Sequence, residues 1–246
     1  MTVEMAVSGA LVGFTRCTST AISASNPLDA NNIAPNYGLN TPDEAQRVKD
    51  FRETLSKKLG SPAVWMQQTH SDVVATVPNA TYNTDNSVAA DAVIVPAGVI
   101  ATVQVADCVP VIIVDSRLKI AAAAHAGRAG IEKEILAETI QQMQQMGSQI
   151  NDLAAAVGPC ICEKCYEVGP DVYEKYVGLF PQGASETSWG TPSINLRKVV
   201  TDQLMEQGIT EIIQDETCTL EADDLNSYRQ NPHCGRQIGW VLFPNP

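Results

Sequence analysis

The sequence predicts an α/β or α+β fold in which helices cover mixed β-sheets. Strand patterns dominate one continuous stretch, from Ala63 to His125, and helical patterns flank it on both sides. The chain has 246 residues, at the upper end for one domain, and no segment rich in Pro, Gly and Ser divides it. We therefore expect residues 1–246 to form a single compact layered domain.

The first part of the chain predicts a strand, a long loop and a helix. The strand is expected at the apolar segment GALVGFT. Residues 18–41 are polar and rich in turn formers, and long loops in compact domains are often functional. A helix is expected from Thr41 to about Lys58, because Pro42 suits a first turn and Gly60 suits a helix end.

Both helices and strands are expected after His125. A helix is expected from Ile131 to Met146, with Met143 and Met146 as core residues. The later elements expected are a strand at LAAAVG, helices at VGPDVYEKYVGLF and INLRKVVTDQLMEQG, and strands at TEIIQ and QIGWVLF.

Composition and charge limit the class of partner. Acidic residues number 28 against 16 basic ones, a net charge of −12, which disfavours nucleic acid and anionic membranes as partners. The apolar region from Ala89 to Val114 is interrupted by Asp and Pro, and no signal-peptide pattern opens the chain. Seven unevenly spaced cysteines do not resemble a secreted disulfide framework. We expect a cytoplasmic protein that acts on small molecules; the oligomeric state stays open.

Two of the three histidines and one cysteine form a candidate site. VPVIIV and KIAAAA predict an antiparallel hairpin, and a turn centred between Ser116 and Arg117 would place Cys108 directly opposite His125. Directly opposed residues have Cβ atoms about 4.5–5.5 Å apart, so the thiol and imidazole could share a metal ion or a proton. His70, which follows another apolar run, could supply a third group.

Five sequence blocks carry a family resemblance. ADAVIV, ADCVPVIIVD, AAAAHAG, VGPCICEKCYEVG and NSYR…CGRQIGWV resemble, in order, the signature blocks of the YfiH family, also called the laccase-domain or polyphenol oxidase family. The resemblance implies an architecture similar to the catalytic domain of cytotoxic necrotizing factor. It also implies a zinc site that falls on His70, Cys108 and His125.

The resemblance further implies phosphorolysis of purine nucleosides (adenosine, guanosine, inosine and methylthioadenosine) and deamination of adenosine. The substrates would then be nucleosides and phosphate. An older description of the family implies a copper-dependent polyphenol oxidase. A further alternative is a metal-binding protein that acts in peptidoglycan quality control and has little catalytic turnover of its own.

The chemistry of the three residues fits a catalytic zinc, because three protein ligands leave a fourth position open. Copper is the alternative metal, since one Cys and two His also match a blue-copper centre. A multicopper cluster would need more imidazoles, and only His233 remains. A third alternative is a metal-free hydrolase in which His125 activates Cys108 as a nucleophile.

Four arginines are candidate substrate contacts. Arg128 follows His125 in HAGRAG, where family members carry His-Ala-Gly-Trp-Arg-Gly, so the Trp is missing and the Arg is displaced by one position. Arg128 would meet an anion near a helix start. Arg16 matches an early family arginine, with a surface salt bridge as the alternative. Arg229 and Arg236 are expected at the rim of the cleft, with ordinary surface charge as the alternative.

Two further features stay open in the sequence. Cys160, Cys162 and Cys165 resemble part of a zinc or iron–sulfur set, but no fourth ligand is adjacent, so a structural loop beside the site is expected. Asp91 and Glu167 are candidate acids, with turn or capping contacts as the alternative.

Overall fold

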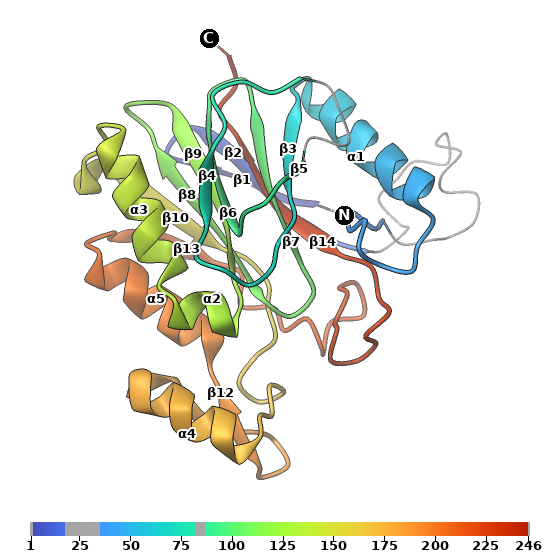
Figure 1. Ribbon diagram of the computed structural model, residues 1–246, viewed down its shortest axis with the longest axis vertical. Helices are drawn as coiled ribbons and strands as arrows, with labels where there is room; N and C mark the ends of the chain where they lie inside the picture. Colours follow the sequence, from blue (N-terminus) through green and yellow to red (C-terminus); the bar gives the residue numbers. More distant parts are fainter. Residues whose placement is uncertain (1, 18–34, 82–86, 246) are drawn as a thin grey trace.

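Two six-stranded sheets packed face to face form the centre of the protein (Figure 1). The computed structural model describes residues 2–17, 35–81 and 87–245, so most of the expected loop over residues 18–41 lies outside the described part. The first sheet has the strand order β1-β2-β14-β7-β3-β5, and the second has the order β13-β10-β8-β9-β6-β4. The expected mixed α/β architecture is confirmed.

The strands of the first sheet are β1 (Thr2–Val7), β2 (Ala10–Thr15), β14 (Gln237–Leu242), β7 (Ile100–Val105), β3 (Ala63–Met66) and β5 (Ser87–Val88). Those of the second are β13 (Glu211–Gln214), β10 (Leu153–Val157), β8 (Val109–Asp115), β9 (Ile120–Ala126), β6 (Ala92–Pro96) and β4 (Val74–Thr76). The helices are α1 (Ala45–Leu59), α2 (Arg128–Glu132), α3 (Ile135–Gln145), α4 (Pro170–Leu179) and α5 (Leu196–Glu206). A small sheet of β11 (Ala184–Glu186) and β12 (Pro192–Ile194) packs beside α4. Within the described ranges, no helix is both long and apolar enough to cross a bilayer.

The central strands are buried on both faces, which creates four layers. In β9, Ala121 and Ala123 lie in the core between the two sheets, whereas Ala122 and Ala124 face the helices on the other side. This alternation follows from the two-residue period of a strand. Helices α2, α3 and α5 cover the outer face of the second sheet, and α1 covers the outer face of the first (Figure 1).

Helix α1 begins at Ala45 rather than at the expected Thr41. The side-chain amide of Asn36 donates hydrogen bonds to Thr41 Oγ1 at 2.7 Å and to Asp43 Oδ2 at 3.0 Å. These bonds hold residues 41–43 in a turn before the helix starts. The helix ends as expected at Gly60, which adopts a left-handed conformation with φ 65°.

The helix expected from Ile131 to Met146 is split in two. The backbone N–H of Lys133 bonds to the carbonyls of Ala129 and Gly130 and ends α2, and the next residue, Glu134, has φ 62° before α3 begins. Met143 lies in the core as expected, but Met146 is 42% exposed, so its assignment to the core was wrong.

The β8–β9 hairpin has a different register from the expected one. His125 pairs with Pro110, not with Cys108, because the turn spans residues 116–119 and is centred one residue later than expected. Asp115 Oδ1 accepts the N–H groups of Arg117 and Leu118, both at 2.8 Å, and its carbonyl accepts the N–H of Lys119. This side-chain cap stabilises a turn of the expected length that begins one residue later in the chain, so the predicted register was wrong by one residue on each strand.

Candidate functional site

The three candidate ligands meet at one end of the sheet sandwich. Cys108 lies in the connection from β7 of the first sheet to β8 of the second. His70 lies between β3 and β4, on a second connection that crosses between the sheets. His125 is the penultimate residue of β9, antiparallel to β8. The two crossings and the end of β9 therefore bring these side chains together despite the changed register.

The geometry of the three side chains fits a tetrahedral metal ion. Cys108 Sγ lies 3.7 Å from His70 Nε2, and the ring centroids of His70 and His125 are 4.6 Å apart. One donor atom from each residue lies within 4.8 Å of the other two. A sulfur and a nitrogen bound to the same zinc ion at tetrahedral angles are about 3.6 Å apart. The residues present can therefore hold zinc with one coordination position left open.

Asp91 orients His125 from the buried side of the site. Its Oδ1 accepts from His125 Nδ1 at 2.8 Å, which leaves Nε2 of the ring for a metal ion. The same carboxylate accepts the backbone N–H groups of residues 69–71 and the hydroxyl of Ser71 at 2.6 Å. Burial alone would raise the pKa of Asp91, but the hydrogen bonds from His125 and Ser71 hold it well below its usual range. A single ionised carboxylate thus positions both histidine segments.

Cys108 and His125 influence each other's protonation. Burial opposes the ionised form of both, but the charge and hydrogen bonds of His125 and His70 lower the pKa of the Cys108 thiol below its ordinary value. Burial likewise disfavours the His125 imidazolium, but the Cys108 thiolate and Asp91 raise the His125 pKa. The thiol therefore loses its proton readily, as both a metal ligand and a nucleophile require.

The backbone around the site leaves no space for an additional side chain. A Cβ atom placed on Gly127 would lie 2.8 Å from His70 Cδ2 and 2.9 Å from Cys108 Sγ. His70 itself has φ 60°, and Asp107, the residue before Cys108, has φ 87°. Non-glycine residues in this region cost energy and concentrate at functional sites.

Asp107 is held by two hydrogen bonds from the C-terminal part of the chain. Its Oδ1 accepts the hydroxyl of Thr219 at 2.6 Å, and its Oδ2 accepts the backbone N–H of Arg229 at 2.7 Å. The position of Cys108 therefore depends on segments that are far away in the sequence.

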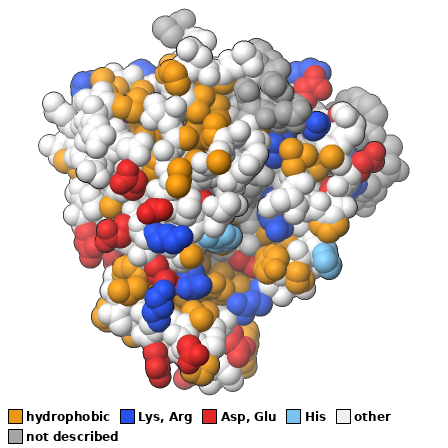
Figure 2. Space-filling view, in the orientation of Figure 1, with side chains coloured by type: hydrophobic (Ala, Val, Ile, Leu, Met, Phe, Trp, Pro, Cys, Tyr) orange, Lys and Arg blue, Asp and Glu red, His pale blue; other side chains and the backbone are white. Residues whose placement is uncertain are grey.

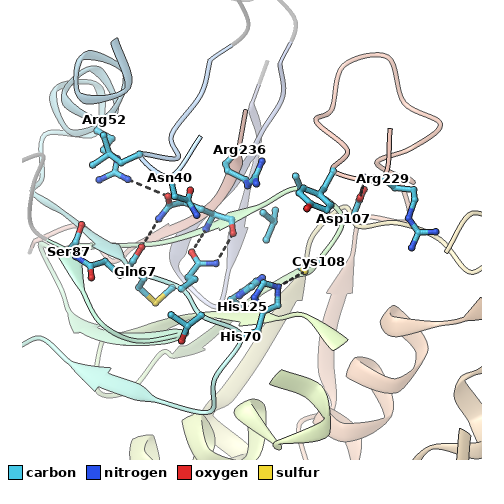
Figure 3. Close-up of a pocket in the computed structure, with 18 of the residues that line it drawn as sticks. Asn40, Arg52, Gln67, His70, Ser87, Asp107, Cys108, His125, Arg229 and Arg236 are labelled. Atoms are coloured by element: carbon cyan, nitrogen blue, oxygen red, sulfur yellow. Dashed lines mark hydrogen bonds between the residues drawn. The ribbon is translucent and has the colours of Figure 1, made fainter. Parts of the chain in front are cut away.

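A cavity of about 710 Å³ opens at the three ligands. In the close-up, His70, Cys108 and His125 lie between Gln67 and Ser87 on one side and Asp107 and Arg229 on the other (Figure 3). This volume falls within the range of small-molecule sites, about 300–1,000 Å³. The described residues that line it are Leu39, Asn40, Arg52, Met66, Gln67, Gln68, Thr69, His70, Ser87, Gln104, Val105, Ala106, Asp107, Cys108, His125, Tyr166, Tyr228, Arg229 and Arg236.

The structure places two of the four candidate arginines in the cavity wall. The guanidinium of Arg229 lies 5.1 Å from the centre of the Tyr166 ring and that of Arg236 lies 5.8 Å from the Tyr228 ring. Arg16 and Arg128 are not among the described residues that line the cavity. Arg16 forms ion pairs with Asp215 and Asp224, the alternative that the sequence left open.

Arg128 lies at the edge of the site, at the first position of α2, and forms an ion pair with Glu132. Lys133 donates from Nζ to the carbonyl oxygen of His70 at 3.1 Å, which adds a second positive charge there. Basic side chains gather around the histidine at the middle of this face of the molecule (Figure 2). Glu132 pairs with both Arg128 and Lys175, so part of this positive charge is balanced.

Several cavity residues were not anticipated from the sequence. Arg52 packs 4.3 Å over the Trp65 ring and donates to the Tyr37 carbonyl and to Gln104 Oε1. The side-chain amide of Gln68 bonds to both the backbone N–H and the carbonyl of Gln104. Gln67 and Gln68 could have been predicted to lie near the site, because they belong to the polar run directly before His70. Arg52 on α1 could not, because its sequence context is that of an ordinary helix residue.

The two candidate acids have different positions. Asp91 accepts hydrogen bonds from the His125 ring and from the backbone of His70, so it orients these two residues. Glu167 is not among the described residues that line the cavity; its carboxylate accepts from Trp189 Nε1 at 3.0 Å, and its backbone carbonyl accepts from Arg229. Neither placement identifies a group that donates a proton to substrate.

Comparisons with known proteins agree on one family. The family model described as multi-copper polyphenol oxidoreductase laccase matches residues 22–244. A Streptomyces griseus protein named purine nucleoside phosphorylase ORF3 is 36% identical over 211 residues, covering 84% of this chain and 85% of that protein. A protein named adenosine deaminase RL5, from an unknown prokaryotic organism, is 37% identical over 144 residues, covering 54% and 55%.

The fold is shared with solved structures. The crystal structure of the hypothetical protein YfiH from Bacillus licheniformis superposes with a TM-score of 0.79, covering 95% of this chain and 92% of that one at 24% identity.

Proposed function

Because the chain belongs to the YfiH-like family of multi-copper polyphenol oxidoreductase laccases, we propose that it is a zinc-dependent purine nucleoside phosphorylase that also deaminates adenosine. The observation that carries this proposal is the open-sided set of His70, Cys108 and His125 in the wall of a cavity of about 710 Å³. Such a cavity can hold a nucleoside together with phosphate. The names of the relatives support the substrate class.

Zinc fits the ligand set, and when bound it would supply a Lewis acid at the open fourth position. The protein's own groups supply the remaining requirements. Asp91 fixes the ring of His125 in the tautomer that presents Nε2, and Gly127 leaves room for His70 and Cys108 to approach each other. Copper remains the alternative metal, but with three histidines in the chain there are too few imidazoles for a multicopper centre.

The polar wall of the cavity suits a nucleoside and phosphate. The side chains of Asn40, Gln67 and Ser87 offer donors and acceptors for a base or for ribose hydroxyls. Arg229 and Arg236 offer positive charge for phosphate inside the cavity, and Arg128 offers it at the edge. In phosphorolysis, a phosphate oxygen forms a bond to C1′ of ribose while the C1′–N9 bond breaks, and the leaving purine takes up the proton that hydrogen phosphate gives up.

A metal-free reaction is the second candidate, favoured by the lowered pKa of Cys108 beside two imidazoles. Cys108 would then attack substrate as a nucleophile, with His125 accepting its proton. Alkylation distinguishes the two: a zinc-bound thiolate is protected until a chelator removes the ion, whereas a free nucleophile reacts at once.

The test of the proposed function is product analysis by chromatography. We expect inosine and phosphate to give hypoxanthine and ribose 1-phosphate, and adenosine to give both adenine and inosine. Arg128→Ala should raise the KM for phosphate more than it changes the zinc content. Equally fast release of hypoxanthine without phosphate would mean hydrolysis. Failure to release base from any purine nucleoside would contradict the enzymatic proposal and leave a non-catalytic role, such as peptidoglycan editing.

A further inference from the structure

A second group of metal-ligating side chains lies outside the catalytic site. One donor atom from each of Cys162, Cys165, Cys218 and Glu221 lies within 4.8 Å of the others. Cys165 Sγ lies 3.5 Å from Glu221 Oε1, and the backbone N–H of Cys162 donates to Cys218 Sγ at 3.3 Å. We call these four residues the cysteine cluster. The sequence offered no fourth ligand because two members lie more than fifty positions beyond the first two.

Two similar turns present the four side chains. Cys162 and Cys165 are three residues apart, and the Cys162 carbonyl accepts the N–H of Cys165 at 3.1 Å. Cys218 and Glu221 have the same spacing, and the Cys218 carbonyl accepts the N–H of Ala222 at 3.1 Å. A Cys-x-x-Cys pair on a tight turn is the usual half of a structural zinc site. The second turn supplies the matching half with one thiolate and one carboxylate.

Cys160 does not belong to the cluster, although it is part of the same sequence motif. It is fully buried in the main helix–sheet core, and its backbone forms an isolated bridge with Cys218. The third cysteine of the candidate metal site is thus Cys218 and not Cys160.

The surroundings of the cluster also fit a bound ion. Cys165 and Cys218 are buried, whereas Glu221 lies at the surface. The two thiols would therefore bind an ion from the protein interior, and the Glu221 carboxylate would separate it from solvent. The accompanying apolar core is small, with Ile161 as its other buried member. Residues 215–236, all of which the structure describes, contain no helix and no strand. Irregular segments of this length are uncommon in compact domains, and a bound ion would add to the hydrogen bonds from Thr219 and Arg229 that hold this one.

We propose that the cysteine cluster binds a structural zinc ion through Cys162, Cys165, Cys218 and Glu221. Thiolates select zinc over hard cations, and four protein ligands fill its tetrahedral shell, which is the pattern of a structural rather than a catalytic site. The N–H of Cys162 that points at the Cys218 sulfur is the outer hydrogen bond expected around a metal thiolate.

This ion would fasten together two segments that shape the active site. Tyr166 follows Cys165 and lines the cavity, and Thr219 follows Cys218 and donates to Asp107 beside Cys108. Zinc in the cysteine cluster therefore holds both turns against the wall of the cavity without contacting substrate. Zinc binding by the cysteine cluster does not depend on which reaction the catalytic site performs.

The test is metal analysis of freshly purified protein in a Cys108→Ala background, which separates this proposal from the zinc proposed for the catalytic site. We expect the background variant to retain about one zinc ion per chain, and to lose it on Cys165→Ser or Cys218→Ser. Cys234→Ser in the same background is the matched control and should keep the ion. Replacement by Co²⁺ should give thiolate charge-transfer absorption that disappears with the same two substitutions.

A further variant tests the proposal if the cysteine variants fail to fold. Glu221→Gln changes an exposed side chain, so the fold should persist while a chelator removes the zinc faster. A Cys108→Ala protein that is folded, contains no zinc and takes up neither Zn²⁺ nor Co²⁺ would overturn the proposal. A disulfide between two cluster cysteines in protein purified under reducing conditions, seen as a mass lower by two hydrogens, would also overturn it.

Discussion

Asp91 is the residue on which the geometry of the site depends most. It is fully buried and joins the His70 segment to the ring of His125 through one carboxylate. Carboxylates behind a ligating histidine fix its ring and increase its basicity. Asp91 is thus a positioning residue, and its contribution should be measurable through the metal.

We expect Asp91→Asn to weaken zinc binding by about 10- to 100-fold, the range for outer partners of metal ligands. Competition with a chromophoric chelator measures this affinity. Asp72→Asn is the matched control, because Asp72 is exposed and close in sequence. Equal zinc affinities for the two variants would contradict the orienting role of Asp91.

Gly127 allows a separate test of the crowded ligand set. Its φ of −76° is accessible to alanine, so a substitution adds a methyl group without backbone strain. That methyl group would clash with His70 and Cys108. Overpacking costs about 1–3 kcal/mol, so we expect Gly127→Ala to reduce zinc affinity by about tenfold or more.

The control for this prediction is Gly178→Ala in α4, where an added Cβ has no neighbour within 4 Å. Its zinc affinity should match that of the unmodified protein. An unchanged affinity for Gly127→Ala would show that the ligands do not approach as closely as the geometry indicates.

Secondary-structure elements were predicted well where apolar periodicity determines them, and less well where a side chain caps the backbone. Strands such as β10, and the end of α1 at Gly60, follow from pattern and from glycine conformation. The β8–β9 turn begins one residue later than expected, after Asp115, whose side chain caps two backbone N–H groups. Local hydrogen bonds of this kind compete with regular structure and are hard to detect in a sequence.

The ion pair of Arg16 with Asp215 joins the end of β2 to the end of β13, elements of different sheets. Burial alone would raise the pKa of Asp215, but bonds from Thr217 and Arg16 lower it below its usual value. A carboxyl with a lowered pKa stabilises the folded state above its unfolded pKa, about 3.9. That stability is lost as the pH falls through the folded pKa.

We therefore expect Asp215→Asn to reduce the free energy of unfolding by about 1–2 kcal/mol at pH 7. The difference from the unmodified protein should shrink as the pH falls below about 4. Urea unfolding at several pH values measures it, with Asp223→Asn at an exposed position as the control. A difference that does not vary with pH would show that the charge of Asp215 is not responsible.

The whole molecule has four layers, and the site lies where the chain crosses from one central sheet to the other. His70, Cys108 and His125 were recognisable from the sequence because histidines are few and their segments match family blocks. The orienting role of Asp91, the place of Arg52 in the cavity wall and the second half of the cysteine cluster were not recognisable, because each depends on contacts between distant segments. Sequence spacing indicates ligands on neighbouring strands, whereas tertiary structure supplies the groups that orient them.

Restoration of activity by added zinc shows whether the site of His70, Cys108 and His125 is catalytic. Chelator-stripped protein is titrated with zinc while hypoxanthine release from inosine and phosphate is followed, with His125→Ala compared against His233→Ala at an exposed position outside the ligand set. We expect that the stripped protein is inactive, that zinc restores phosphorolysis in the unmodified and His233→Ala proteins, and that His125→Ala stays inactive. Full phosphorolysis by the stripped protein or by His125→Ala would contradict it.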